Sequence, residues 1–232
     1  MTQRMTRRSM TGLIMGGAAA VSGVTGIAQL AARPAEASAG THAMHGVRAI
    51  AVSTGQEELR TQLRKLWADH VFWTRLYIIS AVDGLADADV AAKRLLGNQD
   101  DIGNAVRPVY GDAAADQLTS LLRDHITGAA ALLAAAKSGD QSATEKASTA
   151  WYANADQIAD FLASANPDHW PQADLRAGMT MHLDQTLTEA KARMSGDYAA
   201  DVLAFDEIFK HMMDFSDLLA NGIVAQFPDK FA

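Results

Sequence analysis

Apolar residues recur along this chain at alternating steps of four and three residues, which is the spacing of a buried helix face. The first such run consists of Leu59, Leu63, Leu66, His70, Trp73 and Tyr77. No strand-like alternation of apolar and polar residues and no hairpin signal interrupts the pattern. Alanine is abundant and aromatic residues make up only 6% of the chain, which favours helices over strands. The sequence therefore predicts an all-α protein.

Residues 1–39 are predicted to be an export signal. They have a basic start, an apolar run rich in glycine and alanine, and small residues before a cleavage point after Ala37 or Ala39. Arg7 and Arg8 precede the apolar run, as in twin-arginine signals, which export proteins that have already folded. An uncleaved membrane anchor is the alternative, which the glycines of the run disfavour. We therefore expect a periplasmic or extracellular protein.

The charge and the absence of cysteine exclude several kinds of partner. The chain has a net charge of −7, and loss of the signal would remove four arginines but only one glutamate. Such a surface repels phosphate groups, so we expect neither nucleic-acid binding nor stable membrane association after cleavage. Because the chain has no cysteine, thiolate-bound metals and iron–sulfur clusters are excluded.

Capping residues and helix breakers divide the rest of the chain. Residues 40–53 are predicted to be a flexible lead-in, and residues 54–232 a helical bundle domain. Gly97, Gly103 and Pro108 predict short helical pieces within the segment 83–110. The predicted architecture is an up-and-down bundle of four to five long helices, with this broken segment crossing one end. The long helices are expected at about 54–82, 112–137, 140–165, 171–195 and 197–226.

Four of these helices carry a histidine near their midpoint, namely His70, His125, His182 and His211. In a bundle of helices of similar length, the midpoints share one level whichever way each helix runs. The four imidazoles are therefore expected to converge in the core. The assignment of His211 is the weakest, because a second apolar stripe competes for the buried face of its helix.

We predict that these histidines bind one transition-metal ion, which could be zinc, copper, manganese or iron. Glu207, one helical turn before His211, is the expected carboxylate ligand. A closed set of four ligands would make the ion structural, whereas an open position would support small redox or hydrolytic chemistry. The histidine-free helix at 140–165 is expected to wall the site with Trp151 and Tyr152.

Two other interpretations stay open. The first is a metal-free module that binds a partner or a small apolar ligand, with its core histidines paired to hydroxyl groups. In the metal interpretation, by contrast, Thr74 and Thr186, each four residues after a histidine, are expected to hydrogen-bond the ligand side chains and orient them. The second is a b-type haem held by two facing histidines. The distances between the histidine side chains distinguish these interpretations, because one ion cannot bridge histidines that lie far apart.

A second metal site depends on the point of signal cleavage. Cleavage after Ala39 would expose Gly40-Thr41-His42, whose amine, backbone nitrogens and imidazole form a square-planar set suited to Cu(II) or Ni(II). Cleavage after Ala37 would abolish that set.

Several motifs resemble a bacterial family of small helical proteins of unestablished function. They are LWADHVFWTR, LLRDHI, NPDHW and GIVAQFP, and the similarity extends over most of residues 55–228. Proteins of this family often carry the labels glycosyltransferase or acetylglutamate kinase. This sequence has neither the nucleotide-binding loops nor the α/β alternation that those activities require. The resemblance implies a single helical domain and places His70 and His125 in its most distinctive motifs, but it implies no reaction.

Overall fold

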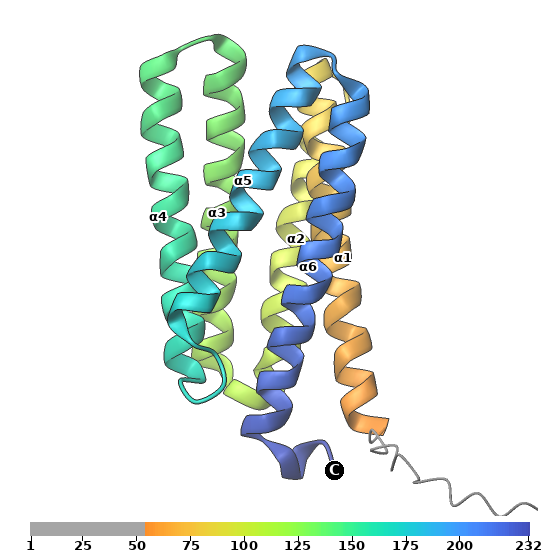
Figure 1. Ribbon diagram of the computed structural model, residues 1–232, viewed down its shortest axis with the longest axis vertical. Helices are drawn as coiled ribbons and strands as arrows, with labels where there is room; N and C mark the ends of the chain where they lie inside the picture. Colours follow the sequence, from red (N-terminus) through yellow and green to blue (C-terminus); the bar gives the residue numbers. More distant parts are fainter. Residues whose placement is uncertain (1–53) are drawn as a thin grey trace, which may run out of the picture. The chain divides into compact units, whose positions relative to one another are not determined.

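The computed structural model describes residues 54–232, and this part of the chain consists of six α-helices and one short 3₁₀ turn. Figure 1 shows the helices lying side by side along one common direction. Their bounds are α1 Thr54–Asp83, α2 Ala88–Tyr110, α3 Asp112–Ser138, α4 Gln141–Ala165, α5 Gln172–Ser195, α6 Tyr198–Gln226 and η1 Pro228–Lys230.

Each helix packs against the next one in sequence, and α6 also packs against α1. The connections are short, so sequential neighbours run antiparallel. The start of α1 and the C-terminus consequently lie at the same end of the bundle (Figure 1). The predicted all-α up-and-down bundle is thereby confirmed.

The segment predicted to be broken differs from the prediction, because it forms the single continuous helix α2. The glycine at position 103 permits close packing, since a Cβ there would lie 1.8 Å from the Thr119 Oγ1 atom of α3. Pro108 lies in the last turn, where the loss of one backbone hydrogen bond is tolerated. The bundle therefore has six helices rather than four or five.

The helix ends follow ordinary capping chemistry. Asp140 and Asp197 begin α4 and α6, and the side chain of each accepts a hydrogen bond from the backbone nitrogen three residues later. Gly139 and Gly196 end α3 and α5 with positive φ angles of 75° and 78°, a conformation that glycine adopts without strain. These paired stop and start signals explain why the boundaries of α3, α4, α5 and α6 agree with the predicted ones.

The buried apolar residues form two clusters. The larger one extends through most of the bundle and includes Trp67, Trp151 and Trp170. The smaller one consists of Ile78, Leu133 and Ala190, which come from α1, α3 and α5. The smaller cluster lies toward the end of the bundle that holds the α3–α4 and α5–α6 connections.

A buried ionic network joins α1, α5 and α6. The Arg75 guanidinium contacts Glu189 at 2.6 Å and Asp201 at 2.7 Å, and the two carboxylates are only 2% and 1% exposed. Arg193 also approaches Asp201, at 3.5 Å, and pairs with Asp83. Burial is the main cause that raises the pKa of Glu189 to about 7, against the opposing effect of Arg75. The network thus places two acids in the interior, and the Arg75 guanidinium is their main counter-charge.

Within residues 54–232, no helix combines the length and apolar character needed to cross a membrane. The predicted export signal, the lead-in at 40–53 and the amino-terminal Gly40-Thr41-His42 set all lie outside the residues that the structure describes.

Candidate functional site

Three of the four predicted histidines meet in the core of the bundle. His70 of α1, His125 of α3 and His182 of α5 are 2%, 2% and 4% exposed. The ring centroids of His70 and His182 are 5.7 Å apart, and those of His125 and His182 are 6.0 Å apart. We call these three residues the histidine cluster. The expected convergence of mid-helix histidines is thus observed for this trio.

Side-chain amides orient two members of the histidine cluster. Asn154 donates its amide hydrogen to the Leu121 carbonyl, so its Oδ1 faces His125 and accepts from the Nδ1–H group at 2.9 Å. Gln99 donates to the Leu95 carbonyl, and the same amide nitrogen lies 3.3 Å from Nδ1 of His70. Nδ1 of His70 therefore accepts a hydrogen bond, whereas Nδ1 of His125 donates one.

Two ring nitrogens of the cluster are buried without a hydrogen-bond partner among the described residues. They are Nε2 of His125 and Nδ1 of His182. Because His125 carries its proton on Nδ1, its Nε2 presents a lone pair to the interior. An unsatisfied buried polar atom costs about 1–3 kcal/mol, so this part of the core is less stable than an apolar one would be.

The histidine cluster is uncharged at neutral pH. Burial lowers the pKa of His70 to about 3, and the neighbouring His125 adds to the effect. Burial also lowers the pKa of His125 to about 4. The pKa of His182 falls well below the usual value, because of burial first and then the proximity of the other histidines. The cluster therefore contributes polar atoms to the core without contributing charge.

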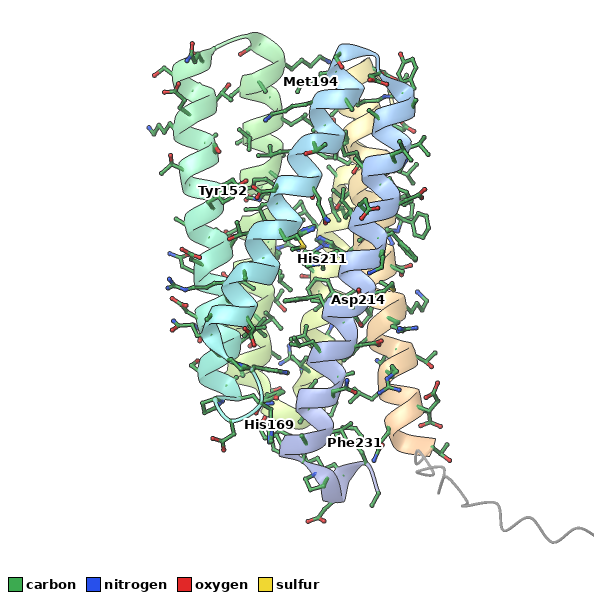
Figure 2. All side chains as sticks on the ribbon, in the orientation of Figure 1. Tyr152, His169, Met194, His211, Asp214 and Phe231 are labelled. Atoms are coloured by element: carbon green, nitrogen blue, oxygen red, sulfur yellow. The ribbon has the colours of Figure 1, made fainter. Side chains whose placement is uncertain are left out.

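His211 lies near enough to His182 to contribute to the lowering of the His182 pKa, but its ring contacts Phe215 rather than the cluster. His211 lies partly buried on α6 (Figure 2). Its Nε2–H group donates to the Gly178 carbonyl of α5 at 2.9 Å. Glu207 is exposed and lies apart from the cluster. Within residues 54–232, no group of three or more His, Asp or Glu side chains is placed so that it could hold a metal ion. The metal site therefore stays a prediction, and Glu207 lies on the wrong face of α6 to supply its carboxylate.

The two threonines that were expected to hydrogen-bond the ligand side chains do not bond to the histidine rings, and no imidazole pairs with a hydroxyl group in the described residues. The hydroxyls of Thr74 and Thr186 donate to the backbone carbonyls of His70 and His182 rather than to imidazole nitrogens. The imidazoles instead contact side-chain amides and a backbone carbonyl. Gln99 was missed because it lies in the segment that was predicted to be broken.

Of the two α4 residues that were expected to flank the histidines, Trp151 and Tyr152, only the first does so. The Trp151 indole stacks on the His125 ring with centroids 5.2 Å apart, and its Nε1–H donates to the His125 carbonyl at 3.0 Å. Tyr152 lies on α4 (Figure 2), and its hydroxyl instead donates to Asp184 of α5. Trp151 therefore forms a side of the histidine cluster.

An apolar cavity of about 210 Å³ lies one helical turn beyond the histidine cluster. Thr74, Ala129 and Thr186, which line it, each follow a cluster histidine by four residues. Trp151 lies between the cavity and His125. The other lining residues are Tyr77, Ile78, Leu95, Ile126, Leu132, Leu133, Ala136, Thr144, Ser148, Leu187, Ala190, Lys191 and Met194.

The sequence analysis did not predict this cavity. It exists because small side chains from different helices face one another, among them Ala129 and Ala136 of α3 and Ala190 of α5. The alanine-rich run at 128–136 was the available signal, but alanine is also common on exposed helix faces.

The chain matches no known protein family, no curated protein and no solved structure in comparisons with each. The resemblance of its motifs to the helical bacterial family stays a prediction. The histidine cluster and the cavity are therefore the features of this chain that bear on its function.

Proposed function

We propose that this protein binds a small, mainly apolar molecule in the cavity beside the histidine cluster. The cavity itself carries the proposal, because protein interiors are normally packed without voids of this size. A molecule that fills the cavity gains about 25 cal/mol for each Å² of apolar surface that it removes from water.

The size of the cavity sets the size of the ligand. An apolar cavity of about 150 Å³ in another protein accepts benzene, so 210 Å³ accommodates a molecule of about eight non-hydrogen atoms. The lining is mostly aliphatic and aromatic, and the histidines beyond it are neutral. The part of the ligand that lies inside must therefore be uncharged and largely apolar.

1-Octanol is a suitable first probe, because it has an apolar chain and about the right size. We expect it to bind the wild-type protein in isothermal titration calorimetry, with the negative heat-capacity change that accompanies apolar burial. Ala129→Leu places an isobutyl group in the cavity and is expected to weaken binding at least tenfold.

Ala134→Leu is the matched control, because Ala134 lies on the same helix but is exposed and does not line the cavity. Its affinity for 1-octanol should equal that of the wild type. Ala129→Leu should also raise the melting temperature of the free protein, since it fills empty space. Absence of binding to the wild type, or equal binding by all three proteins, would refute the proposal.

A second candidate function is the binding of one transition-metal ion, zinc, copper, manganese or iron, by the histidine cluster. The two buried nitrogens without partners, on His125 and His182, support it. Coordination through Nε2 of His70 would need a proton on Nδ1. Gln99 would then have to present Oε1, which is itself buried without a partner in the described part of the chain.

Elemental analysis of protein purified without a histidine tag tests this candidate. Metal binding predicts one ion per chain, lost in the His125→Ala/His182→Ala double variant and retained in His169→Ala, which removes an exposed histidine. A wild-type protein without metal, after incubation with each of the four ions and dialysis, would exclude it.

A further inference from the structure

The electrostatic character of the cavity differs from that of the chain as a whole. The chain contains 27 acidic and 20 basic residues, yet the cavity lining contains no aspartate or glutamate and a single lysine, Lys191. Lys191 is also the only exposed residue of the lining, which places it at the solvent-facing edge of the cavity. The entrance to an apolar cavity therefore carries one positive charge.

Lys191 has no ion-pair or hydrogen-bond partner among residues 54–232. The residues one helical turn away on α5 are Leu187, Thr188, Met194 and Ser195, none of which is acidic. On the facing helix α4, the Glu145 carboxylate already accepts a hydrogen bond from Gln141 at 2.9 Å. The ammonium group is thus available to a ligand.

Two hydroxyl groups of the lining are also without partners in the described residues, those of Tyr77 and Ser148. The Tyr152–Asp184 hydrogen bond joins α4 to α5, and these helices run antiparallel. Ser148, one turn before Tyr152, therefore lies level with Thr188, about one turn from Lys191. By contrast, the Thr144 hydroxyl already donates to the Asp140 carbonyl. The α4–α5 side of the cavity thus offers a cation and a free hydroxyl donor.

We propose that the ligand is a medium-chain monocarboxylate, with its apolar chain in the cavity and its carboxylate at Lys191. This inference rests on the proposed function, because it names the ligand class of the same cavity. A carboxylate completes the pairing of the ammonium group and accepts a hydrogen bond from the Ser148 hydroxyl. A cationic amphiphile would place like charges together at the entrance.

Octanoate and 1-octanol form a matched pair of probes, since they share the chain and differ in the charge of the head group. We expect the wild-type protein to bind octanoate more tightly than 1-octanol at pH 7.5 and low salt. Lys191→Gln should weaken octanoate binding about threefold to fivefold and leave 1-octanol binding unchanged, as removal of a partly exposed ion pair predicts. Sodium chloride should weaken the binding of octanoate but not that of 1-octanol.

Lys146→Gln is the control for net charge, because Lys146 is an exposed residue of α4 that does not line the cavity. It should bind both probes as the wild type does. Tight 1-octanol binding without a preference for octanoate would overturn this inference and leave the proposed function intact. Equal weakening of both probes by Lys191→Gln would also overturn it, since the lysine would then act through its apolar stem. Failure of both probes to bind the wild type would overturn the proposed function as well.

Discussion

Acidification from pH 7.5 to pH 5 is expected to destabilise the protein by several kcal/mol. The three cluster histidines stay neutral in the folded state, because burial lowers the pKa of each, to about 3 for His70 and about 4 for His125. In the unfolded chain they take up protons below about pH 6.5. Between these values the unfolded state binds more protons, so stability falls as the pH falls.

The size of the effect follows from linkage. At pH 5 each histidine that stays neutral in the folded state lowers the free energy of unfolding by about 2 kcal/mol, so three lower it by about 6 kcal/mol. The free energy of unfolding of a typical domain is about 5–15 kcal/mol. Glu189 acts in the opposite direction, because its pKa is raised to about 7 and its folded form binds a proton first. Protonation of this one carboxyl stabilises the fold from about pH 7 down to about pH 4.5 and offsets only part of the loss.

Urea unfolding at pH 7.5, 6 and 5 measures this dependence. The free energy of unfolding should fall most steeply below pH 6.5. His125→Leu replaces one histidine by a group that cannot be protonated, so its loss of stability between pH 7.5 and 5 should be about 2 kcal/mol smaller than that of the wild type. His169→Leu, at an exposed position, should retain the wild-type dependence. A stability that is unchanged between pH 7.5 and 5 would contradict the neutral cluster.

Removal of the Arg75 guanidinium is expected to destabilise the protein by about 3–5 kcal/mol at pH 7.5. Arg75→Met keeps much of the apolar stem but leaves Glu189 and Asp201 buried without their main counter-charge. Arg193 compensates only in part, since it lies 3.5 Å from Asp201 and pairs with Asp83. Urea unfolding of the variant measures the loss.

A triple variant separates the charge effect from packing. Adding Glu189→Gln and Asp201→Asn to Arg75→Met removes both uncompensated charges and should recover much of the lost stability. The surface control is Arg107→Met, whose partners Asp112 and Asp116 are exposed, and it should cost less than about 1 kcal/mol. Equal losses for Arg75→Met and Arg107→Met would show that the buried network does not depend on its guanidinium.

The sequence carried enough information to predict the histidine cluster, because the convergence of mid-helix residues depends only on helix lengths and short connections. The cluster histidines lie near the middle of α1, α3 and α5, which were delimited by capping residues such as Asp140 and by glycines such as Gly139. The role of Glu207 could not be predicted in the same way. His211 is only partly buried, so a residue four positions before it can face either the core or solvent.

Two features required the tertiary structure. Gly103 was interpreted as a helix breaker, whereas the missing Cβ permits α2 to approach Thr119 of α3. Sequence patterns do not distinguish these two uses of glycine. The cavity likewise depends on which alanines of separate helices face one another, and no local pattern of Ala129 or Ala190 reveals that alignment.

The most direct test of the cavity as a ligand site is the NMR signal of the Met194 methyl group in protein labelled with ¹³C-methyl methionine. Met194 lines the cavity, whereas Met181 on the same helix is 50% exposed and does not line it. Titration with 1-octanol should shift the Met194 signal to a saturating value and leave the Met181 signal in place. A Met194 signal that does not respond, or one that shifts together with Met181, would contradict binding in the cavity.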